Sequence, residues 1–239
     1  MSLSIIIPVR NEEENILETA IKIKKFLLFE FEICFIDDFS SDKTFEVITN
    51  YIDKNRIDNI KIYKNTSPGL GPAINKGIEI SSKNYLTIMM CDGSDDLDDL
   101  KKYYEIISNQ NLDAVFGSRF IKGSRVVNYP LKKLILNRIF NYFVSLVFFS
   151  KFNDFTNAFK IYNKKSIIKL QPIVSESFNV FLELPLKIIA RNMSYEVIPI
   201  SWKNRKIGKS KFIIKELGAK YVFTLLYCFF EKILLKKNK

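Results

Sequence analysis

Short apolar runs alternate with amphipathic stretches through the first half of the chain. Four runs rich in β-branched and aromatic residues have the length of buried strands, at 4–9, 32–36, 60–63 and 85–90. Between them, apolar residues recur at helical spacing over about 11–29, 44–54 and 73–81. Strands that alternate with helices of this length predict a parallel sheet with right-handed crossovers.

The second half of the chain is less regular. A helix to about residue 109 and a strand near 114–116 continue the alternation, and the stretch 154–162 is expected to lead into another helix. The remaining expected elements are a helix at 131–149, a helix at 178–191, a strand at 195–200 and the final helices. The pattern as a whole predicts an α/β fold.

The stretch from Tyr85 to Asp99 changes abruptly from apolar to acidic. The apolar run reads as a strand that delivers carboxylates to the edge of a sheet, where ligands of open α/β sheets bind. Crowded carboxylates repel one another unless a cation such as Mg²⁺ or Mn²⁺ neutralises them, and such a cation can bridge phosphate oxygens. A helix capped by Ser94, with Asp95 and Asp96 in its first turn, explains the acids equally well, and both interpretations can hold together.

The composition narrows the chemistry. Lys and Arg exceed Asp and Glu by eleven, which indicates an anionic partner: nucleic acid, a membrane surface or phosphorylated substrates. The aromatic residues lie in apolar runs and form no stacking platform, so we expect no nucleic acid. The chain has no histidine, which excludes Ser-His catalysis and His-ligated zinc. Apolar surroundings without metal-site spacing predict reduced thiols at Cys34, Cys91 and Cys228.

The apolar segments are too short to span a bilayer. The longest candidates are 143–149 and 221–235, and the second is interrupted by Glu231 and Lys232. The N-terminus carries no cleavable signal pattern, so we expect a cytoplasmic protein. The apolar, lysine-bearing stretch 131–149 is typical of an interfacial helix, which predicts peripheral contact with the inner face of the membrane. Ordinary amphipathic core helices are the alternative.

Seven motifs occur in a fixed order along most of the chain. They are IIIPVRNEEENI at 5–16, IDDFSSDKT at 36–44, GLGPAINKG at 69–77, CDGSDDL at 91–97, GSRF at 117–120, DFTNAFKIYNK at 154–164 and NRKIGKSKF at 204–212. Each is weak alone, but together they resemble the family 2 glycosyltransferases, most closely those that act on polyprenyl phosphates. The resemblance implies a GT-A, Rossmann-like fold, with a mostly parallel sheet flanked by helices. It covers a domain over 1–212, followed by C-terminal amphipathic helices over 213–239.

The resemblance also implies a donor site. Family members hold the nucleotide in loops that correspond here to Pro8, Arg10, Asn11, Glu12, Asp37, Asp38 and Gly71. Their Asp-x-Asp motif binds a divalent cation, Mg²⁺ or Mn²⁺, on the sugar nucleotide. In this chain it aligns as Met90-Cys91-Asp92, so its first carboxylate is missing. The predicted metal ligands are therefore Asp92 together with Ser94, Asp95 or Asp96.

Cations complete the implied site. Arg119 matches a family position that meets phosphate, with a surface salt bridge as the alternative role. Arg138 falls on the helix that family members turn toward the lipid phosphate. Arg205 and Lys211 match a basic loop that closes over the diphosphate. The residues predicted to carry catalysis are thus Asp92, Arg119, Arg205 and Lys211.

The expected reaction is an inverting transfer from a nucleoside diphosphate sugar to a polyprenyl phosphate. A phosphate oxygen is already anionic, so it needs no strong general base, which suits a chain without histidine. The Gln-x-x-Arg-Trp motif of processive polysaccharide synthases is absent. Transfer to a saccharide hydroxyl, with Glu183 or Asp154 as the base, stays open, as does an inactive homologue that only binds sugar nucleotides.

Overall fold

The computed structural model describes residues 2–204 and 214–237, with the side chains of 218–235 in the second segment. Its strands are β1 Leu3–Val9, β2 Phe31–Asp37, β3 Ile60–Lys64, β4 Tyr85–Ile88, β5 Ala114–Ser118, β6 Arg125–Val127, β7 Lys160–Asn163, β8 Tyr195–Pro199 and β9 Ser201–Lys203. Its helices are α1 Ile16–Phe26, α2 Thr44–Asn55, α3 Leu70–Ile80, α4 Leu97–Gln110, α5 Leu131–Phe148, α6 Lys164–Lys169, α7 Val180–Ala190 and α8 Ile214–Lys237.

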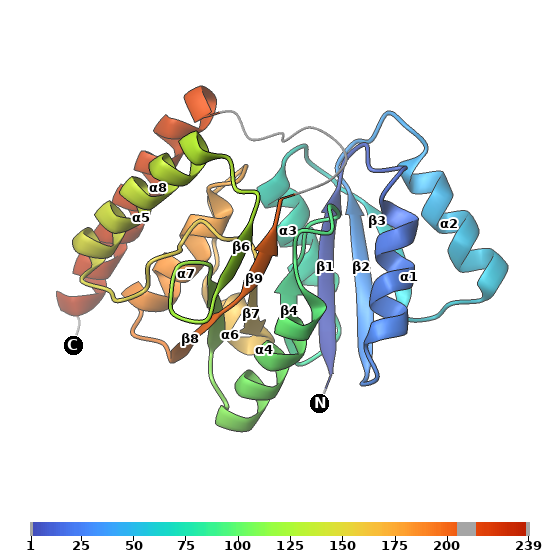
Figure 1. Ribbon diagram of the computed structural model, residues 1–239, viewed down its shortest axis with the longest axis horizontal. Coiled ribbons are helices and arrows are strands. Elements are labelled where there is room, and N and C mark those ends of the chain that lie inside the picture. The colour runs from blue at the N-terminus through green and yellow to red at the C-terminus, as the bar shows by residue number, and fades with distance from the viewer. Residues whose placement is uncertain (1, 205–213, 238–239) are drawn as a thin grey trace.

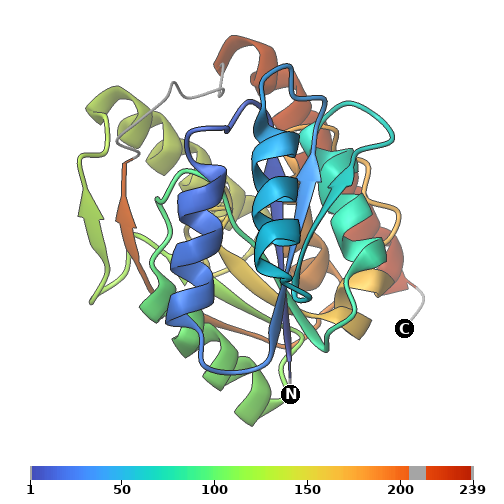
Figure 2. The same ribbon diagram turned by 90° about the vertical axis from the view of Figure 1, so that its right-hand side faces the viewer.

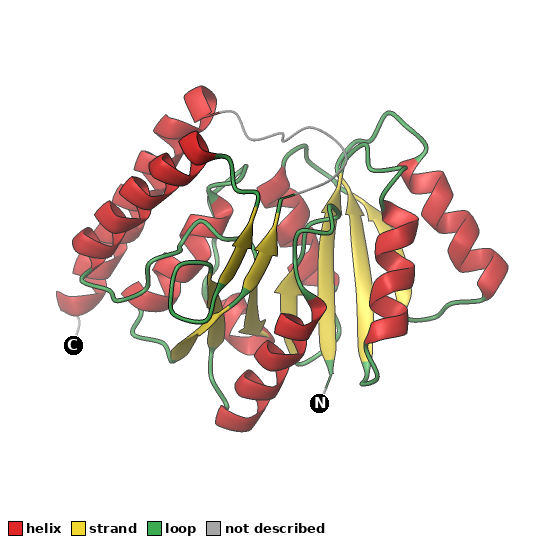
Figure 3. Ribbon diagram, in the orientation of Figure 1, coloured by secondary structure: helices red, strands yellow, loops and turns green. Residues whose placement is uncertain are grey.

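A seven-stranded sheet forms the centre of the molecule, in the order β3-β2-β1-β4-β7-β5-β8 (Figure 1). Only β7 runs antiparallel to its neighbours in this sheet, so the predicted mostly parallel α/β architecture is confirmed. A second, two-stranded parallel sheet of β6 and β9 lies apart from the first (Figure 3). The parallel strands bring the loops after β1, β2 and β4 to one edge, where ligands of such sheets bind.

Helices cover both faces of the sheet, and the alternation of side chains along β1 shows why. Ile5 and Ile7 join the core beneath α1, α2 and α4, whereas Ile6 points into the core shared by α3 and α7. Figures 1 and 2 show α1 and α2 at one side of the molecule and α5 and α8 at the other. Tyr221 and Leu225 of α8 are buried in the second core, so this helix packs on the domain.

The short strands were not predicted from the sequence. Residues 160–163, assigned to a stretch that leads into a helix, form β7, and β6 and β9 were missed. Three or four residues are too few to display the alternation that marks a strand, and β7 begins with the fully buried Lys160. The expected final helices are one helix, α8.

Large apolar side chains are exposed on the outward faces of α5 and of the described part of α8. On α5 the exposed apolar residues are Leu131, Ile135, Leu136, Ile139, Tyr142, Phe143 and Leu146. On α8 they are Val222, Phe223, Leu226, Phe230, Ile233, Leu234 and Leu235. Of the helices described, none has the length and hydropathy needed to cross a bilayer. We call these fourteen residues the outer apolar face; a patch of this kind marks an interaction surface.

Candidate functional site

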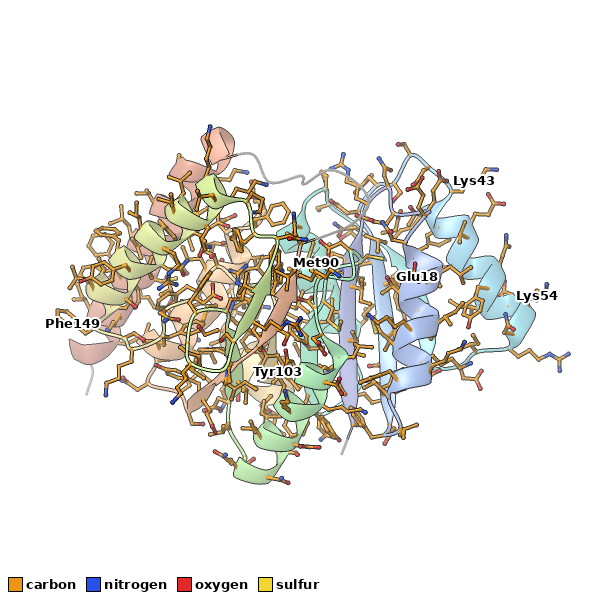
Figure 4. The ribbon with its side chains drawn as sticks, in the orientation of Figure 1. Glu18, Lys43, Lys54, Met90, Tyr103 and Phe149 are labelled. Carbon is orange, nitrogen blue, oxygen red and sulfur yellow. The ribbon has the colours of Figure 1, made fainter. Side chains whose placement is uncertain are left out.

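Asp92 lies in the loop that follows β4, at the edge where the parallel strands end. Its Oδ1 accepts a hydrogen bond from the Ser94 backbone N–H at 3.1 Å, which turns the loop back on itself. Asp92, Ser94 and Asp95 line one pocket of about 210 Å³, which we call the acidic pocket. Met90, near the middle of the molecule in Figure 4, lines it too. The predicted convergence of these residues is therefore present.

Asp95 is buried beside Asp92. Burial and then the negative charge of Asp92 raise the pKa of Asp95 to about 7. Two ionised carboxylates in one pocket repel each other, and a bound divalent cation would relieve this repulsion. The residues present therefore fit a metal ion, which Asp92 and Asp95 would hold with help from Ser94.

Asp96 does not belong to this set. Its Oδ1 accepts the backbone N–H of Asp98 at 2.8 Å, so Asp96 caps α4, and Ser94 is not the cap. Within residues 2–204 and 218–235, no group of three His, Cys, Asp or Glu side chains could hold a metal ion. Mg²⁺ is commonly bound by only one or two carboxylates plus substrate phosphates, so the smaller set still suffices.

The predicted donor residues lie in two loops that are hydrogen-bonded to each other. Pro8 is buried at the end of β1, and Asn11 Oδ1 accepts from the Ser41 backbone N–H at 2.8 Å. The Glu12 N–H donates to Thr44 Oγ1 at 2.8 Å. Arg10 Nη1 lies 3.9 Å from Asp38 Oδ2, with most of its side chain exposed. The loops after β1 and β2 thus form one rigid rim of the sheet edge.

The two aspartates at the end of β2 have different surroundings. Asp38 Oδ1 accepts from the Gly69 N–H at 2.8 Å and from Asn65 Nδ2 at 2.9 Å, which ties β2 to the start of α3. Asp37 Oδ1 is buried and has no hydrogen-bond partner among the residues that the structure describes. A buried acceptor without a donor is costly, so Asp37 suits a ligand that supplies one.

Gly71 packs against the chain before α7. Its N–H donates to the Glu176 carbonyl at 3.1 Å, and an added Cβ would lie 1.7 Å from the Ser175 carbonyl oxygen. This close approach explains the glycine without a nucleotide. The contact that the sequence predicted between Gly71 and the donor stays a prediction.

Arg119 is buried and forms an ion pair with Asp154. Its Nε and Nη2 donate to the two carboxylate oxygens of Asp154 at 2.8 and 2.7 Å, and its backbone N–H donates to Oδ2 at 2.9 Å. Burial alone would lower the pKa of Arg119, but the charge and hydrogen bonds of Asp154 outweigh it and raise the pKa. The expected surface salt bridge is thus an internal one, and Asp154 fixes the guanidinium in place.

Arg138 of α5 lies next to this pair. It donates to the Asn153 carbonyl at 2.8 Å and stacks on the Phe120 ring at 4.2 Å. Burial and the charge of Arg119 lower the pKa of Arg138, although Asp154 partly opposes them. The turn at 153–154 therefore holds both arginines that the sequence assigned to phosphate.

An apolar groove of about 410 Å³ continues from the acidic pocket between α5 and α8. The two cavities share Arg119, Tyr129, Lys133, Thr156, Phe178 and Phe181. Beyond them the groove is lined by Leu136 and Phe140 of α5 and by Tyr221 and Val222 of α8. Because Leu136 and Val222 are also exposed, the groove reaches the outer apolar face.

Lys133 is the site residue that sequence analysis missed. It stands at the junction of the acidic pocket and the apolar groove, and it forms no salt bridge with any residue that the structure describes. Its position on the first turn of a lysine-bearing helix was visible, but the cavity that it faces depends on the packing of α8. The other predicted cations, Arg205 and Lys211, lie outside the described residues.

Comparison with known proteins now decides the family. The family model described as glycosyl transferase family 2 matches residues 4–171. The chain belongs to glycosyl transferase family 2. It is thus a glycosyltransferase, as the ordered motifs predicted.

Three curated relatives of this glycosyltransferase act on lipid phosphates by name. It is 30% identical over 223 residues to dolichyl-phosphate beta-glucosyltransferase of Dictyostelium discoideum, covering 87% of this chain and 68% of that protein. It is 27% identical to dolichol-phosphate mannosyltransferase of Pyrococcus furiosus, with 95% of this chain and 62% of the relative covered. It is 24% identical to polyprenol monophosphomannose synthase of Mycolicibacterium smegmatis, with 87% and 79% covered. The chain thus spans about two thirds of the first two.

Solved structures confirm the GT-A fold. Glucosyl-3-phosphoglycerate synthase from Mycobacterium tuberculosis, solved with Mn²⁺, UDP and glucosyl-3-phosphoglycerate, superposes with a TM-score of 0.69 at 13% identity, covering 95% of this chain and 79% of that one. Residues 1–349 of TarS from S. aureus superpose with a TM-score of 0.57 at 19% identity, covering 83% and 58%. Identities this low carry the fold alone.

The two candidate general bases of the glycosyltransferase are both engaged. Asp154 is fully buried and accepts three hydrogen bonds from Arg119. Glu183 is fully buried 2.8 Å from Lys187 Nζ, and it accepts the backbone N–H groups of Val174 and Ser175. A carboxylate that is buried and saturated in this way is a poor base for an acceptor hydroxyl.

Proposed function

We propose that this glycosyltransferase moves a sugar from a nucleoside diphosphate sugar to a polyprenyl phosphate, with inversion at the anomeric carbon. One observation carries the proposal: the acidic pocket, suited to a cation and a diphosphate, opens directly into an apolar groove between α5 and α8. A polar reaction centre joined to an apolar groove suits an acceptor that has a phosphate at one end and a hydrocarbon chain at the other. The names of the curated relatives agree with that acceptor.

The donor would bind along the edge formed by the ends of β1, β2 and β4. The unpaired Asp37 Oδ1 would accept a hydrogen bond from the ribose or the base, beside the rim built by Arg10, Asn11 and Glu12. Asp92 and Asp95 would hold Mg²⁺ or Mn²⁺ with Ser94. The bound cation would neutralise the diphosphate as it leaves.

In the reaction, an acceptor phosphate oxygen attacks the anomeric carbon as the bond from that carbon to the diphosphate oxygen breaks. The electron pair of the broken bond leaves with the nucleoside diphosphate, and no proton has to be removed from the nucleophile. Lys133 would meet the incoming phosphate, since it stands where the two cavities join. Arg119, aligned by Asp154, and Arg138 would add positive potential around it.

The outer apolar face supports a second part of the proposal, namely that the enzyme rests on the cytoplasmic face of a membrane. The exposed rings and aliphatic chains of α5 and α8 would enter the interfacial region, and Lys132 and Lys220 would meet anionic headgroups. The hydrocarbon chain of the acceptor could then pass from the groove into the bilayer without crossing water.

A radiolabelled transfer assay tests the proposal. Purified protein is incubated with Mg²⁺ or Mn²⁺, a panel of labelled sugar nucleotides, and either a polyprenyl phosphate in anionic vesicles or a simple saccharide. We expect label that extracts into organic solvent and depends on the lipid phosphate. Label found only in water-soluble oligosaccharide would overturn the proposed acceptor.

A further inference from the structure

Trp202 is the single tryptophan of the chain, and it stands in the wall of the acidic pocket. It belongs to β9 and is only partly buried. It also lines an adjoining cavity of about 470 Å³, the outer pocket, which shares Ser94 and Asp95 with the acidic pocket and which Phe26 also lines. An indole at this boundary keeps part of its surface available to a ligand.

The backbone of β9 is fixed to the first turn of α4 and to the preceding loop, which carries the carboxylates. The Ser201 N–H donates to Asp99 Oδ2 at 2.6 Å, and the Lys203 N–H donates to the Ser94 carbonyl at 3.3 Å. Between these two residues, the backbone of Trp202 pairs with that of Asp95 in an isolated antiparallel β-bridge. The indole is therefore held at a set position relative to the predicted metal ligands.

The indole also touches the cationic end of the same pocket. Its ring lies 4.9 Å from the Tyr129 ring and 5.7 Å from the guanidinium carbon of Arg119. Tyr129 precedes α5 by two residues, and β6, the partner of β9, precedes Tyr129. Trp202 thus lies between the carboxylates and the cations of the pocket, and secondary structure holds it there.

In the proposed reaction, the sugar is the group that moves between these two ends. The diphosphate must lie by Asp92 and Asp95, and the attacking phosphate by Lys133 and Arg119. The acidic pocket, at about 210 Å³, is smaller than the roughly 300 to 1,000 Å³ of drug-sized ligand sites, so it suits the reacting end of the donor, the diphosphate and one sugar, and not the whole nucleotide. A hexose presents a face of C–H groups. The negative face of an aromatic ring attracts the partly positive hydrogens of these groups.

We propose that Trp202 forms the sugar subsite of the donor and stacks on the C–H face of a hexose. The inference rests on the proposed function, because it takes the donor to be a nucleoside diphosphate sugar. It assigns to β9 a substrate contact that none of the sequence motifs carried. The contact serves the sugar and not the nucleotide, so removing the indole should separate the two in binding measurements.

Intrinsic fluorescence and calorimetry test the inference. With Mn²⁺ present, glucose and mannose esters of uridine and guanosine diphosphates are compared with the free diphosphates. We expect the preferred ester to change the Trp202 emission more than its free diphosphate does. By calorimetry, Trp202→Ala should weaken that ester about tenfold and leave the free diphosphate within about twofold, while Trp202→Phe keeps most of the affinity. Phe26→Ala, which alters only the outer pocket, serves as the matched control and should leave both affinities unchanged.

The outcomes separate two failures. Equal weakening of ester and free diphosphate by Trp202→Ala, or weakening of neither, would overturn the sugar subsite while leaving the proposed function in place. A wild-type protein that binds none of the nucleotides would overturn the proposed function, and the sugar subsite with it.

Discussion

The proposed donor half and the proposed acceptor half of the molecule are held together by different interactions. At the ends of β1, β2 and β3, side-chain carboxylates and amides bind backbone N–H groups of neighbouring loops, as Asp38 binds Gly69 and Asn11 binds Ser41. The helices α5 and α8 lie at the other side of the molecule (Figure 1). They pack through apolar side chains and expose others. The first arrangement suits a polar ligand in water, and the second suits contact with hydrocarbon.

The Arg119–Asp154 pair stands at the border between the two halves. It lies where the acidic pocket meets the apolar groove, and its charges satisfy each other before any substrate arrives. Lys133, in the same place, has no such partner in the described part of the chain. In the proposed reaction, Arg119 would therefore serve through its fixed alignment, and Lys133 would make the main direct contact with the phosphate.

The largest expected effect separates two neighbouring acids of the donor half. Asp92→Ala should lower turnover about 10²- to 10³-fold, because it removes a carboxylate that holds the cation on the leaving diphosphate. Asp96→Ala should keep turnover but lose about 1 kcal/mol of stability, because Asp96 caps α4. Steady-state kinetics in titrated Mn²⁺ and urea unfolding measure both. Near-normal turnover in Asp92→Ala would show that the metal assignment is wrong.

The next prediction removes the ion pair between Arg119 and Asp154. Asp154→Ala leaves Arg119 buried and unpaired, which should cost about 3 to 5 kcal/mol of unfolding free energy. The double variant Arg119→Met/Asp154→Leu should recover much of the stability but not the affinity for the acceptor. Urea unfolding and the acceptor KM distinguish stability from alignment. Full activity in the double variant would reduce the pair to a structural role.

A smaller effect compares two adjacent lysines of α5. Lys133→Ala should raise the acceptor KM by one to two decades, since losing one charge-assisted phosphate contact costs about 1.5 to 3 kcal/mol. Lys132→Ala is the matched control when the acceptor is supplied in detergent, where the proposed headgroup contact of Lys132 plays no part, because Lys132 is exposed and lines neither cavity. The donor KM should change in neither variant. Identical acceptor constants in the two variants would remove Lys133 from the site.

Membrane contact should respond to changes on the outer apolar face alone. Phe143→Asp or Phe223→Asp should weaken binding to anionic vesicles about tenfold, because each removes a large exposed apolar side chain. Leu28→Asp, which alters a 91% exposed leucine in the loop between α1 and β2, should leave binding unchanged. Vesicle sedimentation measures the binding, which should also weaken as salt screens the lysines. Equal losses in all three variants would contradict a membrane-facing α5 and α8.

A separate effect is a pH dependence of the stability of the metal-free protein. Asp95 keeps its proton up to about pH 7 in the folded protein, whereas the pKa of the carboxyl is ordinarily 3.8. The stability contributed by the protonated form is present below pH 3.8 and is lost as the pH rises through 7. The melting temperature should thus fall between pH 5 and 8, and Mn²⁺ should restore it at pH 8. Asp95→Asn should flatten this fall; an unchanged slope would assign the dependence to other groups.

The sequence predicted the positions of residues at the sheet edge better than the surroundings of Arg119 and Lys133, for a physical reason. A strand that ends in aspartates, as at Asp37 and Asp92, places its chemistry by local geometry, so the sheet edge could be anticipated. The ion pair of Arg119 joins residues 35 positions apart, and the cavity at Lys133 exists only where α5 meets α8. Such contacts depend on tertiary packing, which periodicity does not report.

The position of Asp96 outside the acidic pocket was not predicted, for the same kind of reason as the short strands. The sequence alone does not distinguish the roles of Asp92, Asp95 and Asp96. The position at which α4 begins decides which of the three caps the helix. Helix boundaries are the least predictable feature of an amphipathic pattern. The carboxylate pair in the acidic pocket could thus be expected as a cluster, but not reduced to its two members.

Photo-crosslinking tests the central claim most directly, namely that the acceptor lies in the groove between α5 and α8. The protein is bound to vesicles that contain a polyprenyl phosphate with a photoreactive group near its phosphate, and the sample is irradiated. The labelled peptides of the protein are then identified by mass spectrometry. We predict labelled peptides that contain Leu136 or Phe140 of α5 and Val222 of α8, with labelling suppressed by excess unmodified polyprenyl phosphate. Labelling confined to other surfaces, or labelling in the groove that the excess lipid does not suppress, would contradict the claim.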